Sequence, residues 1–444
     1  MQESNCKANS CKTLLYVFLG ALVCGMLWRF RGTHGWGSES GILNVGFMFT
    51  MFLVLIAGAN GKTNPCRIAL TAIAFTFSTP AWGTFLNQIK GVISSGPDPI
   101  IYGISPVSGV IMMLLLGFSI SGIYGILLGS MYSRTKWKLI HFIVLAVAFY
   151  GVSYLCCATV SHPILALFEP QAIDAFKESL NNAGITDGVY KTYMAHFDNL
   201  NWGKGLVGGR NYFAAIGTIS LVISTCVSLL LTRFWIGDRK SARVGLLSAL
   251  AFAFAITFSD LFFVIFGDTG TPALIKAEHI HAWGCWEYFT GFFAGGLLTW
   301  IVLKNKECDV EKDGCCEFLP VKARAIIGFI ITAFVIIYCI IRPVAMRYDV
   351  SESQSAIVWA ASVILALVLV YYAVKTRLGT AAPDCVTFCK WTFLAILLIQ
   401  GFVYYFGAGH YANYKNVLDL EHFVTMISLF VAISFVITKI VKEK

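Results

Sequence analysis

The feature that most constrains this chain is a series of apolar stretches of about 20 residues, separated by polar segments. An α-helix needs about 20 apolar residues to cross the hydrocarbon core of a bilayer. The composition agrees, because 57% of the 444 residues are hydrophobic and only 13% are charged, whereas about 25% are charged in a typical soluble domain. We therefore predict an all-α polytopic protein of the cell membrane, with the lipid bilayer as its principal partner.

Twelve stretches meet the length requirement, so the sequence predicts about 12 transmembrane helices. They cover residues 13–28, 41–57, 68–86, 106–131, 138–160, 213–232, 244–266, 284–303, 325–341, 355–374, 391–408 and 422–440. The first stretch is followed by Arg29 and Arg31 rather than by a small-residue cleavage site. We therefore interpret it as a membrane helix and not as a signal peptide.

The distribution of basic residues predicts the orientation of these helices. When the spans alternate in direction, two thirds of the 33 Lys and Arg residues fall on the side that holds the N-terminus, which assigns that side to the cytoplasm. An even number of spans places the C-terminus there as well. The net charge of +9 thus reflects topology, and its spread over many segments predicts no nucleic-acid partner.

A short motif occurs twice and indicates an internal repeat. Residues 34–37 and 281–284 both read His-x-Trp-Gly, after the first and the seventh predicted span. Each copy precedes an acid, Glu39 or Glu287. We predict two six-helix halves, 1–240 and 241–444, related as a parallel 6+6 repeat of the kind found in secondary transporters.

The architecture resembles the major facilitator superfamily in its span count and its 6+6 arrangement. The loop at residues 58–67 occupies the position of that family's conserved motif, but it lacks the expected Asp and Gly-Arg pair. We therefore assign the chain to no family on this basis.

The longest predicted outer segment, 161–212, belongs to the first half and has only a short counterpart in the second. Two stretches within it, 170–182 and 187–199, have the pattern of short amphipathic helices. Loops of this length are usually functional or disordered. We expect this one to form an ordered lid over an extracytoplasmic vestibule.

Polar side chains of the predicted outer face define a candidate vestibule. All but one of the eight histidines map to this face, together with several Trp-Gly pairs. An interfacial aromatic belt would explain the tryptophans alone, but it would not collect histidines on one side. The candidate substrate-binding or proton-handling residues are Arg29, Arg31, His34, Trp36, Glu39, His162, Asp260, His279, His281, Trp283, Glu287 and His410.

Three of these candidates carry charge in unusual places. Arg29 and Arg31 lie on the outer side, against the general bias, and can bind a phosphate, sulfate or carboxylate, although long arginine side chains also snorkel to headgroups. Asp260 is the one acid predicted well inside a span, where ionisable groups mark ion or substrate pathways. A position nearer the outer end of its helix is the alternative for Asp260.

The segment around His279-x-His281 is the densest polar cluster, and its role stays open. Two histidines on one face of an extended segment can bind zinc, and histidine can also act as a general acid or base near neutral pH. Plain interfacial residues are the third possibility. We assign no metal, no cofactor and no catalytic residue from the sequence.

Two functions from different classes fit these features. The first is a transporter of a small polar or anionic solute, with no ATPase activity of its own, because the chain contains no GxxxxGK[ST] loop. The second is a membrane-embedded transferase or hydrolase that acts on a lipid-linked or anionic substrate at the outer face. A structural subunit of a larger complex needs no chemistry and is a third possibility. We favour the transporter on architecture.

Overall fold

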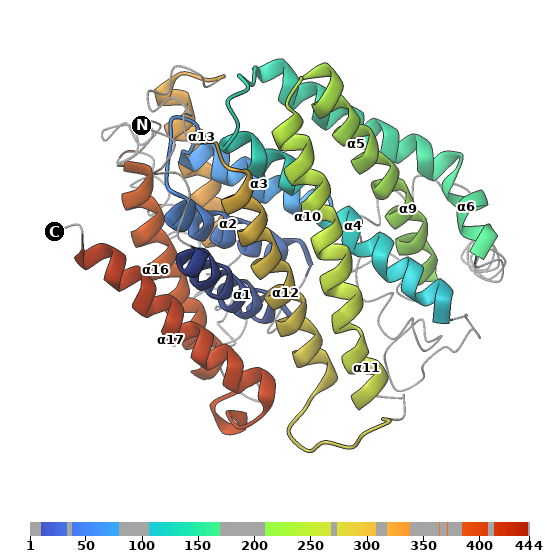
Figure 1. Ribbon diagram of the computed structural model, residues 1–444, viewed down its shortest axis with the longest axis vertical. Helices are drawn as coiled ribbons and strands as arrows, with labels where there is room; N and C mark the ends of the chain where they lie inside the picture. The colour runs from blue at the N-terminus through green and yellow to red at the C-terminus, as the bar shows by residue number, and fades with distance from the viewer. Residues whose placement is uncertain are drawn as a thin grey trace.

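The computed structural model describes residues 10–32, 38–79, 106–168, 209–267, 273–307, 318–337, 384–406 and 413–442, together with positions 364 and 371. Helices dominate these ranges, and none of the described residues is in a β-strand. The predicted all-α fold is therefore confirmed (Figure 1).

Seven helical segments in the described ranges are long and apolar enough to cross a membrane, which makes this a membrane protein by helix length and composition. They are α1 (Ser10–Gly32), α4 (Pro106–Met131), α5 (Leu139–Ala158), α9 (Gly209–Leu230) with η3 (Leu231–Trp235), α10 (Arg239–Ser259) with α11 (Leu261–Phe266), α16 (Asp384–Phe406) and α17 (Leu420–Val441).

Further helices complete the bundle in the described ranges. They are α2 (Ser38–Ala57), α3 (Pro65–Phe77), α6 (Ser161–Phe168), α12 (Ala282–Asn305) and α13 (Val321–Ile336), with the short η7 (Asn413–Asn416). All but one of the twelve predicted stretches coincide at least in part with a described helix, and 355–374 lies outside the described residues apart from positions 364 and 371.

One predicted span is shorter in the structure, and the predicted lid is described only in part. The stretch 68–86 was predicted as one span, but α3 ends at Phe77. Pro80 explains the early end, because a proline disfavours helical geometry in the residue before it and cannot donate a backbone hydrogen bond. The predicted lid begins as a helix, α6, whereas residues 169–208, with both predicted lid helices, lie outside the described ranges.

The outward surface of the helices is apolar, as contact with lipid requires. On α5, Leu139, Ile143 and Val147 recur at the i, i+4 spacing of one helix face, and each is exposed. An exposed apolar stripe of this length is not expected on a monomer in water. Buried Ser and Thr side chains lie at the helix contacts instead, as is usual in membrane bundles.

Close helix pairs of small residues hold the bundle together. The helix α12 lies against α1, and α10 lies against α4 (Figure 1). A Cβ atom added at Gly295 of α12 would lie 2.2 Å from Cβ of Cys24, and one at Gly117 of α4 would lie 2.5 Å from Cα of Ala253. These glycines therefore allow the backbones to approach closely.

The side chains of Lys62 and Lys306 join neighbouring segments at one end of the bundle, which we call the lysine end. Lys62 Nζ donates to the carbonyl oxygens of Ser133 (2.5 Å) and Thr135 (2.6 Å), and Lys306 Nζ donates to that of Ala57 (2.9 Å). Burial, and then the nearby charge of Lys12, lower the pKa of Lys306. The start of α1 and the end of α12 thus lie together, so α1 and α12 run antiparallel.

Candidate functional site

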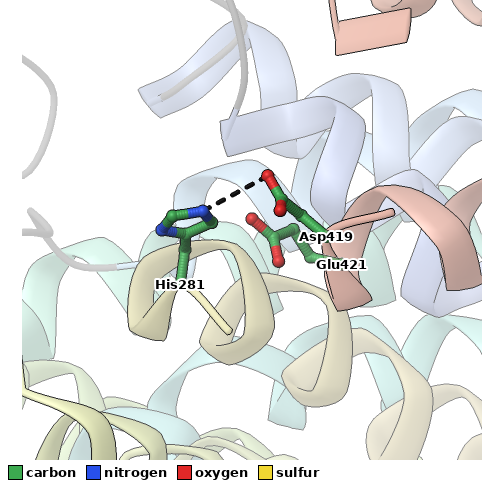
Figure 2. Close-up of side chains that lie close together, drawn as sticks. All are labelled: His281, Asp419 and Glu421. Atoms are coloured by element: carbon green, nitrogen blue, oxygen red, sulfur yellow. Dashed lines mark ion pairs between the residues drawn. The ribbon is translucent and has the colours of Figure 1, made fainter. Parts of the chain in front are cut away.

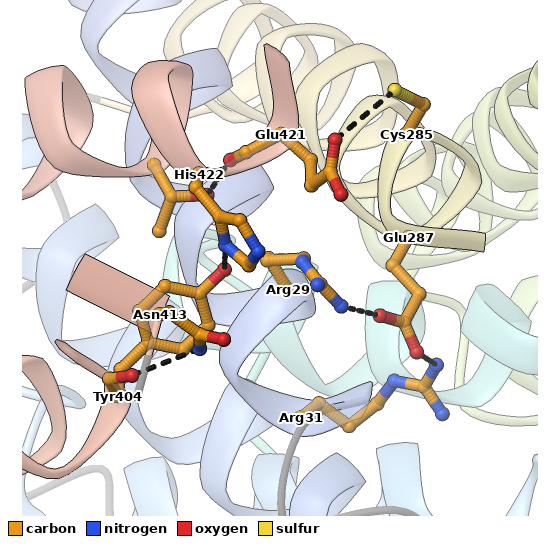
Figure 3. A network of polar contacts seen from close by, with 9 residues as sticks. Arg29, Arg31, Cys285, Glu287, Tyr404, Asn413, Glu421 and His422 are labelled. Atoms are coloured by element: carbon orange, nitrogen blue, oxygen red, sulfur yellow. Dashed lines mark hydrogen bonds and ion pairs between the residues drawn. The ribbon is translucent and has the colours of Figure 1, made fainter. Parts of the chain in front are cut away.

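The opposite ends of α1 and α12 carry a buried triad of charges, in which Glu287 lies between two arginines (Figure 3). Arg29 Nη1 is 2.5 Å from Glu287 Oε2, and Arg31 Nη2 is 3.4 Å from Glu287 Oε1. The three side chains are 12%, 5% and 6% exposed in the order Arg29, Arg31, Glu287. Taking charges out of water is costly, so a buried ion pair depends on both partners being present, and loss of one leaves the other charge buried without compensation.

The local sequence explains how both arginines reach one carboxylate. Positions 29 and 31 are about 200° apart around a helix, so short side chains there would point in opposite directions. The long arginine side chains bend toward Glu287 on the second turn of α12. Trp28 supports one of them, since the guanidinium carbon of Arg31 lies 4.9 Å from the centre of its ring.

The ends of α16 and α17 extend this network. Tyr404 of α16 lies 5.8 Å from the guanidinium of Arg29, measured to its ring centre, and its hydroxyl is 2.7 Å from Nδ1 of His422. Glu421 interacts electrostatically with Arg29 and accepts a hydrogen bond from the thiol of Cys285, with Sγ 3.9 Å from Oε2. Arginine, acid, histidine and tyrosine side chains from four helices therefore meet in one buried network.

The two histidines of the His-x-His segment meet a single carboxylate at the rim of this network. His279 Nδ1 lies 3.1 Å from Oδ1 of Asp419, and His281 Nε2 lies 3.2 Å from Oδ2. The backbone N–H of Leu420 donates to the carbonyl of His279 at 2.9 Å, which fixes the start of α17 against the segment before α12. We call the region of His279, His281, Asp419, Glu421 and the charge triad the histidine end.

Three side chains of the histidine end form the one group in the described residues that has the composition and spacing of a metal site. Possible ligand atoms of His281, Asp419 and Glu421 all lie within 4.8 Å of one another. Figure 2 shows the carboxylates of Asp419 and Glu421 side by side and facing His281. His281 is exposed, whereas both acids are buried.

A glycine makes room for this arrangement. A Cβ atom added at Gly284 would lie 2.5 Å from Cγ and 2.8 Å from Oε1 of Glu421. The Trp-Gly pair of the second His-x-Trp-Gly motif thus has a local explanation, since Gly284 lets the first turn of α17 pack against that of α12. Trp283 packs edge-on against Phe263 and Trp286, with ring centres 5.4 and 6.0 Å away.

Asp260 lies at the junction of α10 and α11, fully buried. Its backbone N–H donates to the carbonyl of Ile256, and its own carbonyl accepts from the N–H of Phe263. The two helices together form one apolar segment of 28 residues, so the acid lies in the last third of that segment. Its position is nearer the histidine end than the middle of the span.

Within the described residues, none of the remaining sequence candidates lies in this network. His162 lies on α6, on the other side of the molecule from α17 (Figure 1). Glu39 belongs to α2, but its side chain is outside the described part of the structure, as are His34, Trp36 and His410.

The contribution of α17 was not predicted from the sequence. Asp419, Glu421 and His422 lie within four consecutive positions at the start of this helix. Asp419 contacts His279 and His281, Glu421 contacts Cys285, and His422 contacts Tyr404. The signal was present as Asp-x-Glu-His directly before an apolar run, but acids in a first helical turn are expected for capping and for the helix dipole. Comparison of the chain with protein-family models, curated proteins and solved structures gives no match.

Proposed function

We propose that this protein is a multi-pass transporter in the cell membrane, which moves a small polar or anionic solute from an extracytoplasmic vestibule. In this proposal twelve spans form two parallel six-helix halves, 1–240 and 241–444, with both termini in the cytoplasm. The lysine end is then cytoplasmic, which agrees with the bias of Lys and Arg residues to that side. The histidine end faces outward.

The observation that carries the proposal is the buried triad Arg29–Glu287–Arg31. Its arginines belong to the first proposed half and its acid to the second, 258 and 256 residues away in sequence. A charge cluster across the two halves acts as a gate at the outer end, because separating the halves requires the pairs to break. The structure then represents the state in which this gate is closed.

The chemistry of the triad also indicates the solute. Arginine binds carboxylate and phosphate groups with two parallel hydrogen bonds, and Glu287 provides such a carboxylate within the protein. An anionic solute that enters the vestibule competes with Glu287 for Arg29 and Arg31. Binding of the solute therefore weakens the gate, which couples occupancy to opening.

Asp260 supplies the coupling-ion site in this account. It is a fully buried acid in a membrane-compatible helical segment, and such residues mark ion pathways in transporters. We assign it the binding of H⁺ or Na⁺ during transport.

Uptake into proteoliposomes tests this proposal. Purified protein is reconstituted and supplied with a panel of radiolabelled small carboxylates, phosphate and sulfate, with a pH or Na⁺ gradient imposed. We expect saturable uptake of at least one anion by the wild type, and loss of gradient-driven accumulation in Asp260→Asn. Glu278→Gln, which changes an exposed acid before the His-x-His segment, should leave uptake unchanged.

The alternative function is a transferase or hydrolase for a lipid-linked or anionic substrate at the outer face. The observation that favours it is the group of His281, Asp419 and Glu421, which combines a possible general base with two acids at an accessible rim. Failure to transport any anion in the panel, together with turnover of a lipid-linked phosphate that His281→Ala abolishes, would replace the transporter by this enzyme.

A further inference from the structure

The start of α17 shows a departure from ordinary helix capping. Asp419 occupies the N-cap of α17, but its carboxylate makes no capping hydrogen bond, although Asp at this position normally accepts one from the first helical turn. Both of its oxygens face imidazole nitrogens instead. The sequence therefore places a good capping residue here, and the fold uses it for another interaction.

The neighbouring groups complete a mixed set of nitrogen and oxygen donors. Glu421 lies two residues after Asp419, and Gly284 leaves the space that the carboxylate of Glu421 occupies. His281 is itself the N-cap of α12 and, like Asp419, makes no capping bond. Two helix ends thus direct three potential ligands into one region, and their ligand atoms lie within 4.8 Å of one another.

We propose that His281, Asp419 and Glu421 bind one divalent transition-metal ion, with Zn²⁺ as the best match to this donor set. Imidazole with carboxylate is a usual ligand combination for zinc. Ligands about 2.0–2.2 Å from a tetrahedral ion lie roughly 3.3–3.6 Å apart, and the 3.2 Å between His281 Nε2 and Asp419 Oδ2 is already close to this separation. A small inward movement of Glu421 completes the set.

His279 acts as a positioning residue in this site. Its Nδ1 contacts Oδ1 of Asp419, the oxygen that does not face His281. A partner of this kind fixes the orientation of a ligating carboxylate. Three protein ligands leave a coordination position open, and His281 lies on the exposed side of the group. The ion is thus reachable from outside the bundle.

Metal binding at this site is measured without transport, so the test is independent of the proposed transport activity. The full-length protein, purified in detergent and stripped with a chelator, is titrated with Zn²⁺ by calorimetry after its accessible thiols are blocked. Co²⁺ replaces Zn²⁺ in a parallel absorption measurement, which separates nitrogen and oxygen ligands from thiolates. We expect one site per chain that survives thiol blocking and whose Co²⁺ spectrum lacks thiolate bands.

Three variants then locate the site. His281→Ala and Glu421→Gln should each weaken binding by at least about 100-fold, more than the roughly 10–100-fold cost of losing an outer-shell partner. His279→Ala should weaken it by about 10–100-fold. His281 is exposed, so its variant should elute from size exclusion as the wild type does.

Two matched controls and two contrary outcomes complete the test. His162→Ala removes a histidine on α6, and Glu278→Gln removes an exposed acid beside His279; neither should change the affinity. Absence of a stoichiometric site in the wild type would overturn the proposal. So would a site whose affinity is the same in His281→Ala as in the wild type.

Discussion

Removal of the Glu287 carboxylate should reveal how strongly the triad holds the histidine end. In Glu287→Gln, Arg29 and Arg31 keep their charges but lose the acid between them. Breaking a buried ion pair by removing one partner costs about 3–5 kcal/mol, because the remaining charge stays buried. Arg29 retains an interaction with Glu421, so we expect the loss of unfolding free energy to lie at the lower end of this range.

The two distances in the triad predict how the loss is divided. Coulombic attraction falls inversely with distance, and the pairs are 2.5 and 3.4 Å long. The attraction of Arg31 to Glu287 should therefore be weaker than that of Arg29. Direct contacts in one network give coupling energies of about 0.5–3 kcal/mol, and the value for Arg29 with Glu287 should fall in the upper half of that range.

Double-mutant cycles measure these couplings. Arg29→Gln, Arg31→Gln and Glu287→Gln are combined in pairs, and the free energy of unfolding is followed by reversible SDS titration in mixed micelles. Glu278→Gln is the matched control, because substitution of an exposed acid should change stability by no more than about 0.5 kcal/mol. If the changes in unfolding free energy of Arg29→Gln and Glu287→Gln add within about 0.3–0.5 kcal/mol in the double variant, the two residues are not coupled and the triad is refuted.

Two glycines should respond in opposite ways to an added side chain. Gly295→Val places a Cβ atom 2.2 Å from Cβ of Cys24, so the α1–α12 contact must open, and we expect a loss of about 1–3 kcal/mol in the same SDS titration. Gly151→Ala meets no atom within 4 Å and removes a poor helix former, so stability should be unchanged or higher by up to about 1 kcal/mol. Equal effects at both positions would contradict the described packing of α1 on α12.

Much of the fold could be predicted from apolar length alone. The predicted stretch 106–131 coincides with α4. The predicted ends of α1, α5 and α17 differ from the observed ends by a few residues, as is normal for helix ends. The length of an apolar run predicts these helices well because nearly every residue of a span must be apolar to lie in the lipid. The end of α3 was missed because the proline after it was counted as part of an apolar run.

The candidate site was only partly predictable. Arg29, Arg31 and Glu287 were selected individually, for charge in an apolar setting, but their pairing depends on the packing of α1 against α12. Sequence periodicity carries no information on which helices become neighbours in a bundle. Asp419 and Glu421 were missed for the same reason, since their partners lie about 140 residues earlier in the chain.

The native thiol of Cys285 gives the most direct test of an outward gate at the histidine end. Cys285 is buried beside Glu421 and two residues before Glu287. In a variant that retains only this cysteine, a membrane-impermeant thiol reagent is added outside intact cells, and the labelling rate is measured with and without Glu287→Gln. We predict slow external labelling with Glu287 and at least about tenfold faster labelling without it. Equal rates, or labelling only from the cytoplasmic side, would contradict the gate.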